Sequence, residues 1–254
     1  MRAAAAALLV LCCLPALARS DPTVIAPAGD ARCPAAASPS TPPRHLDHLA
    51  AAIEAGGPVN ILAVGSATTS GQDSSGDNSF PRRAAKSLQE ALPRVPIALT
   101  VRGGIGMPAV DMLPLIETAL KERHVQLVLW QTGTVEAVRG IPSAELRATL
   151  HAGAALVRKA GADLVLIGPQ FSRVLSSKAD LVPYERALRH TADLPGVALF
   201  DRLDLTRNWV EGGRIDLERA AKGDRPAVLQ TLHGCVGAAL ARFLLTGAGQ
   251  PEAR

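Results

Sequence analysis

The residues with the clearest potential for chemistry lie in a loop of small residues, Gly65 to Gly71, and near the end of the chain. Hydroxyl side chains stand on both sides of Ala67 in this loop, and a lone histidine, His233, lies on the predicted final helix. A hydroxyl becomes a nucleophile when a nearby base accepts its proton. The same small hydroxyl residues also bond backbone amides in turns, so a purely structural role is the competing interpretation.

The position of this loop favours a functional role. It follows the apolar run Val59–Val64, which predicts a buried strand that breaks into a tight turn. In open α/β sheets, ligands bind beyond the carboxyl ends of the strands. This rule selects the loops after the first three predicted strands, at residues 65–71, 102–107 and 131–136.

The loop Gly65-Ser66-Ala67-Thr68-Thr69-Ser70-Gly71 resembles the first sequence block of the SGNH (GDSL-type) hydrolases. The three loops and His233 match the four blocks of that family in order and spacing. The resemblance implies a serine nucleophile at the third residue of the first block, a histidine base, an aspartate that orients it, and donors to the oxyanion. In this chain the third residue is Ala67, whose methyl group cannot attack a carbonyl.

The second and third blocks are retained unequally. By the same resemblance, Gly106 occupies the position of the backbone oxyanion donor. The third block, which usually carries an asparagine donor, contains Val135 at that position. Loss of one oxyanion donor costs on the order of 10²–10³ in rate.

The last block keeps His233 at the position of the base, but Gln230 replaces the aspartate. A glutamine carbonyl can accept a hydrogen bond from the imidazole, although it brings no charge. The resemblance therefore implies that three of five catalytic positions have changed, which indicates a degenerate catalytic apparatus.

Two functional hypotheses follow from these residues. The first is a protein with the SGNH hydrolase fold that has lost serine-esterase chemistry and keeps its cleft for an envelope glycan, an acyl group or a protein partner. The second is an active esterase or deacetylase of cell-envelope esters, in which Ser66 or Thr68 is a displaced nucleophile. Adjacent residues of a tight turn point in different directions, which disfavours Ser66 facing His233. A flavin-binding phosphate loop is a third interpretation, and the low aromatic content of 3% argues against it.

The elements that position these residues alternate between strands and helices. Strands are expected at 59–64, 96–101, 125–130, 163–168 and 197–200, and helices at 46–55, 80–92, 110–123, 143–161, 183–192 and 226–245. This alternation predicts a flavodoxin-like, doubly wound parallel sheet of five strands with helices on both faces, a three-layer α/β/α fold.

The N-terminus predicts export. Residues 1–18 have the charged start, apolar core and small-x-small ending of a secretory signal peptide. A Pro/Ala-rich arm at 19–45 and one hydrolase-like domain at 46–248 are expected to follow. The mature protein is then periplasmic or extracellular, with no later membrane span.

Removal of the signal peptide leaves two cysteines, Cys33 and Cys235. In an oxidising compartment such a pair favours a disulfide between the arm and the final helix. Two unrelated buried thiols are the alternative.

The distribution of charge and the available metal-ligating side chains indicate which binding partners to expect. The 27 basic and 23 acidic residues give a net charge of +4, and the positive charges are scattered, so nucleic-acid binding is not expected. His45 and His48 lie one helical turn apart but lack an evident third ligand, so no metal site is predicted. No cofactor is expected either.

Overall fold

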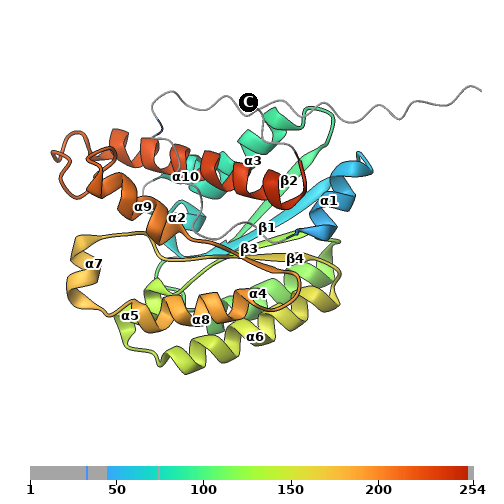
Figure 1. Cartoon of the computed structure of the whole chain (residues 1–254), viewed down its shortest axis with the longest axis horizontal. Helices are drawn as coiled ribbons and strands as arrows, with labels where there is room; N and C mark the ends of the chain where they lie inside the picture. The colour runs from blue at the N-terminus through green and yellow to red at the C-terminus, as the bar shows by residue number, and fades with distance from the viewer. Residues whose placement is uncertain (1–32, 34–44, 74, 251–254) are drawn as a thin grey trace, which may run out of the picture.

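The computed structural model describes Cys33, residues 45–73 and residues 75–250, and the predicted signal peptide and nearly all of the arm lie outside these residues (Figure 1). The strands are β1 (Val59–Gly65), β2 (Ile97–Gly103), β3 (Leu127–Gln131), β4 (Asp163–Ile167) and β5 (Val197–Phe200). The helices are α1 (Asp47–Glu54), α2 (Ala67–Ser70), the 3-10 turn η1 (Gly76–Asn78), α3 (Phe80–Ala91), α4 (Ala109–Glu122), α5 (Thr134–Arg139), α6 (Ser143–Lys159), α7 (Arg173–Lys178), α8 (Val182–Ala192), α9 (Arg202–Glu211) and α10 (Arg225–Gly247).

The five strands form one parallel sheet in the order β2-β1-β3-β4-β5. The chain runs outward from β1 to β2, returns past β1 to β3, and continues to β5, which is the flavodoxin-like doubly wound order. The predicted fold class is therefore confirmed. The reversal of direction beside β1 places the loops after β1, β2 and β3 next to one another at the carboxyl edge.

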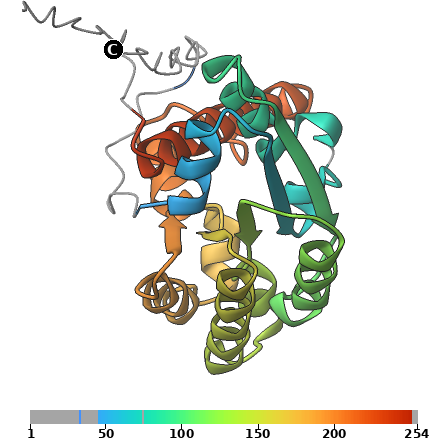
Figure 2. The ribbon, with the colours of Figure 1, turned by 90° about the vertical axis from the view of Figure 1, so that its right-hand side faces the viewer.

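Helices cover both faces of the sheet (Figures 1 and 2). One apolar cluster joins α1, α3, α9 and α10 to alternate side chains of the strands, and a second joins α4, α6 and α8 to the others. All five residues of β3 are buried, as expected for a central parallel strand.

Trp130 shows how closely these layers pack. Its side chain is fully buried, and a Cβ added at Gly153 of α6 would lie 2.3 Å from the Trp130 ring. A glycine at this point of α6 therefore lets the helix approach the indole of β3.

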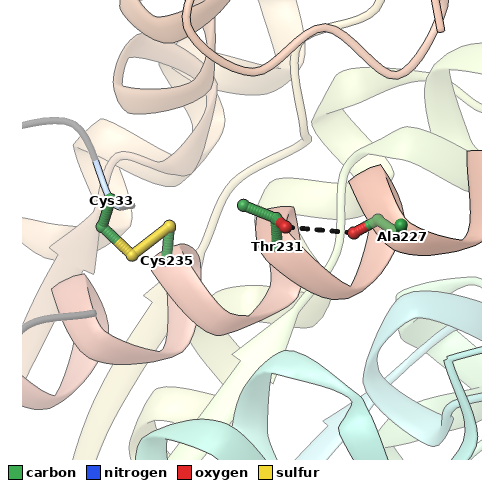
Figure 3. Close-up of a disulfide and its surroundings, with 4 residues drawn as sticks. All are labelled: Cys33, Ala227, Thr231 and Cys235. Carbon is green, nitrogen blue, oxygen red and sulfur yellow. Dashed lines mark hydrogen bonds between the residues drawn. A yellow bond between two sulfur atoms is a disulfide. The ribbon is translucent and has the colours of Figure 1, made fainter. Parts of the chain in front are cut away.

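The predicted disulfide is confirmed: Cys33 is bonded to Cys235 of α10, across a sequence separation of 202 residues (Figure 3). Cys235 is buried and Cys33 packs against the core cluster that contains α10. The bond therefore fixes one point of the N-terminal arm on the helix that carries His233.

Helix α10 is, among the described residues, the one helix long and apolar enough to cross a membrane by length and composition. In its most apolar window, 67% of the helix is buried inside the fold. It packs along α3 and forms part of the core.

Candidate functional site

The loop after β1 turns directly into the short helix α2. Ser66 is the residue that precedes this helix, and Ala67 is its first residue. Gly71 ends the helix with a φ of 86°, in the left-handed region that favours glycine. Ala67 is half-buried and presents only its methyl group, while its carbonyl oxygen accepts the Gly71 amide at 2.9 Å.

Gln131, at the end of β3, organises this loop. Its side-chain carbonyl accepts hydrogen bonds from the Ser66 amide at 3.2 Å, the Thr69 hydroxyl at 2.9 Å and the Thr68 hydroxyl at 3.3 Å. The Ser66 hydroxyl lies 3.5 Å from the same oxygen. The hydroxyl groups of the loop therefore serve the structural role of donors to a buried amide oxygen.

His233 does not face this loop with a free nitrogen. It is 1% exposed, its Nδ1 accepts a hydrogen bond from the Phe80 amide at 2.9 Å, and its Nε2 lies 2.9 Å from Oδ2 of Asp73. Because Nδ1 is an acceptor, the proton of the neutral ring sits on Nε2. The Nδ1 lone pair is therefore used by a backbone amide, and Nε2 faces a carboxylate.

Gln230 plays no part in this arrangement. From the sequence, the Gln230 carbonyl could accept a hydrogen bond from the imidazole, but the described residues form no such bond. Gln230 is exposed on α10, and the imidazole is held by Phe80 and Asp73 instead. The reason is that His233 points into the fold toward the start of α3, whereas Gln230 lies before the helix becomes buried.

Asp73 was not identified from the sequence. Its Oδ1 accepts hydrogen bonds from the amide and the hydroxyl of Ser75. Burial alone raises the pKa of Asp73, but the contacts with His233 and Ser75 outweigh it and hold the pKa below its ordinary value. The Oδ2–Nε2 contact is close in distance but not aligned as a hydrogen bond among the described residues. Asp73 is therefore an ionised neighbour of the imidazole at neutral pH.

Arg202 is a second charged residue that sequence reasoning missed. It is 1% exposed at the start of α9, donates to the Gly168 carbonyl at 3.1 Å and to the Thr68 hydroxyl at 3.3 Å, and stacks over the Phe80 ring at 5.1 Å. Burial lowers the pKa of Arg202 to about 10, and the charge of Asp73 opposes the shift. The guanidinium remains charged at neutral pH and ties the end of β4 to the loop after β1.

The loops of the second and third blocks are joined by Glu136. This buried carboxylate accepts the Ala109 amide, the Thr132 hydroxyl at 3.0 Å and the Gly133 amide at 2.9 Å. Val135 is half-buried on α5 and supplies no hydrogen-bond donor from its side chain. Gly106 keeps a φ of 67° in the loop before α4.

Other polar residues near the sheet edge have structural partners. Asp201 caps α9 by accepting the Asp204 amide and also binds Arg189 at 2.8 Å. Among the residues that the structure describes, no group of three or more histidine, cysteine, aspartate or glutamate side chains is arranged to hold a metal ion.

Similarity to solved structures is found at the level of the fold. No curated protein matches the sequence. A two-domain esterase active on acetylated mannans matches with a TM-score of 0.59 at 17% identity, over 80% of this chain and 53% of that chain. This chain thus spans about half the length of that esterase.

Two further solved structures match over nearly their whole length. A catalytic mutant of an acetylxylan esterase from Geobacillus stearothermophilus gives a TM-score of 0.57 at 15% identity, over 77% of this chain and 96% of that chain. TesA gives a TM-score of 0.53 at 19% identity, over 68% and 95%. The model of the Non-GDSL lipase-like family matches residues 32–250. The chain therefore belongs to the Non-GDSL lipase-like family, and its fold is that of the SGNH hydrolases.

Proposed function

We propose that this protein binds a ligand at the carboxyl edge of its sheet without hydrolysing it by the serine-esterase route. One observation carries the proposal: Nδ1 of His233 accepts the Phe80 amide, and Nε2 lies 2.9 Å from the Asp73 carboxylate. A histidine in this state has no lone pair with which to take a proton from a nucleophile.

The tautomer of His233 differs from that of the histidine in a working triad. In a Ser-His-Asp triad, Nδ1–H of the histidine donates to the aspartate and the Nε2 lone pair faces the serine hydroxyl. Here the proton sits on Nε2 and the lone pair on Nδ1, so the ring has the opposite tautomer. Ala67 supplies no nucleophile and Val135 no oxyanion donor, so three separate roles are unfilled.

The alternative, an esterase with Ser66 or Thr68 as a displaced nucleophile, lacks a base, because both hydroxyls face the Gln131 amide oxygen. The Ser66 hydroxyl is 3.5 Å from the Gln131 amide oxygen, and an amide oxygen does not accept a proton at neutral pH. The retained SGNH architecture is the observation in favour of this alternative.

The proposal extends to the setting of the protein. The sequence of residues 1–18 supports export, and in the periplasm or outside the cell an acyl or glycan ligand or an envelope protein is the expected partner. Solved structures with this fold include an esterase active on acetylated mannans and an acetylxylan esterase, which supports an acyl or glycan ligand.

Labelling with a serine-reactive fluorophosphonate and incubation with p-nitrophenyl acetate test the loss of hydrolysis. We expect no covalent adduct on the intact protein by mass spectrometry, and no ester cleavage above that of a matched Ser66→Ala variant. Stoichiometric labelling of the wild type that disappears in Ser66→Ala overturns the proposal and establishes the esterase. Circular dichroism of both proteins verifies that the variant is folded.

A further inference from the structure

Helix α5 carries an arginine close to the position of the missing oxyanion donor. Arg139 lies four residues after Val135, so the two side chains stand one turn apart on the same side of the helix. Nη2 of Arg139 lies 3.1 Å from the position that a Cβ would take at Gly106. The guanidinium thus lies against the loop of the second block, where Val135 supplies no donor.

The hydrogen-bond donors of Arg139 and the Gly106 amide have no acceptor within the part of the chain that the structure describes. Arg139 forms no ion pair or hydrogen bond there, and the Gly106 amide has no acceptor. Glu136, the nearest acidic residue along α5, forms no ion pair with Arg139, and its oxygens accept the Ala109 amide, the Thr132 hydroxyl and the Gly133 amide.

The loop around Gly106 is held in place. The Ile105 amide donates to the Gln72 side chain at 3.0 Å, and Glu136 accepts the amide of Ala109, the first residue of α4. Arg139 and Gly106 are therefore presented by segments fixed to one another, which reduces the ordering that a ligand must impose.

Each of the two donors has an exposed apolar residue next to it in the chain. Ile105 and Val138, the chain neighbours of Gly106 and Arg139, are 72% and 62% exposed. A guanidinium and a backbone N–H match the oxygens of a carboxylate, and one cation matches its single charge. A neutral ester offers no such charge.

We infer that Arg139 and the Gly106 amide bind the carboxylate of an organic acid, with Ile105 and Val138 in contact with its apolar chain. This assignment rests on the proposed non-hydrolytic function and names its ligand class. The ligand binds as a free acid, with one oxygen on the Gly106 N–H and the other on Arg139.

A titration with hexanoate, followed in amide spectra of the whole protein, tests the site. We expect hexanoate to shift the Gly106 and Ile105 amides and to bind about fivefold more weakly to Arg139→Gln, the size typical of an exposed ion pair. The control is Arg147→Gln, which removes an exposed arginine of α6 and leaves the affinity unchanged. Equal affinity of Arg139→Gln and wild type, equal weakening by Arg147→Gln, or no binding to the wild type overturns the assignment.

Methyl hexanoate provides the second arm and separates the two claims. We expect the neutral ester to bind more weakly than hexanoate and to remain unhydrolysed during the incubation. Equal binding of ester and acid overturns the carboxylate site. Conversion of the ester to hexanoate overturns the proposed non-hydrolytic function, and the hexanoate titration still decides the site on its own.

Discussion

Reduction of the Cys33–Cys235 disulfide is expected to destabilise the fold strongly. The bond closes a loop with a sequence separation of 202 residues. In the chain-entropy treatment, a loop of this length restricts the unfolded chain by about 5 kcal/mol, an upper value because real unfolded chains retain structure. The expected loss of unfolding free energy is therefore about 2–5 kcal/mol.

Urea unfolding followed by circular dichroism, with and without a phosphine reductant, measures this loss. We expect the midpoint of the wild type to fall on reduction, while the secondary structure of the folded state persists because α10 is buried independently of the bond. The control is Cys33→Ser, which should match the reduced wild type and not respond to reductant. An unchanged wild-type midpoint, or an equal response of Cys33→Ser to the reductant, would show that the disulfide does not stabilise the fold in this way.

Three further predictions concern the core and the site. The pKa of Asp73 is lower in the folded protein than its ordinary value of 3.8. The ionised carboxylate therefore contributes stability above pH 3.8, and this contribution is lost as the pH falls below that value. Asp73→Asn should flatten this part of a pH–stability curve measured by urea unfolding. Gly153→Ala places a methyl group 2.3 Å from the Trp130 ring and should cost about 1–3 kcal/mol, whereas Gly234→Ala on α10, with no neighbour within 4 Å, should be neutral or stabilising in the same thermal melts. The triple variant Ala67→Ser, Val135→Asn, Gln230→Asp should gain no esterase activity on p-nitrophenyl acetate, because residue 230 is exposed and the imidazole stays bound to Asp73 and Phe80; activity in this variant would show that the imidazole reorients.

The sheet was predictable because its signals are local. The continuous apolar runs give parallel strands buried on both faces, and β5 was predicted with the bounds that the structure has. The strand order follows from the family resemblance and the alternation of elements. The short helices α2, α5 and α7 were not predicted, because four to six residues carry too little periodicity. Helix α9 was not predicted either.

The site was harder to predict because its contacts are non-local. Asp73 and Phe80 meet His233 across more than 150 residues of sequence, so no spacing rule joins them. Arg202 carried one usable signal, since a charged residue two positions after β5 falls at the carboxyl edge of the sheet. That position indicates proximity to the site but not the burial of the guanidinium.

The contacts of the polar residues around His233 are consistent with the loss of the nucleophile at position 67. The space beside His233 is held by the carboxylate of Asp73, and Arg202 lies over the Phe80 ring next to it. With its Nδ1 lone pair used by the Phe80 amide and Nε2 facing Asp73, His233 has no lone pair to offer a serine hydroxyl at position 67. The residues His233, Asp73 and Arg202 of the site are therefore held by fixed contacts, whereas Gly106 and Arg139 keep free hydrogen-bond donors within the described part of the chain.

The tautomer of His233 shows whether its imidazole can act as the base of a serine hydrolase. Long-range ¹H–¹⁵N correlation spectra of the imidazole at neutral pH distinguish a protonated nitrogen from an unprotonated one. We expect a neutral ring protonated at Nε2, with Nδ1 unprotonated and accepting the Phe80 amide. A ring protonated at Nδ1 with a free Nε2 lone pair, the state that a serine hydrolase requires, would contradict the account.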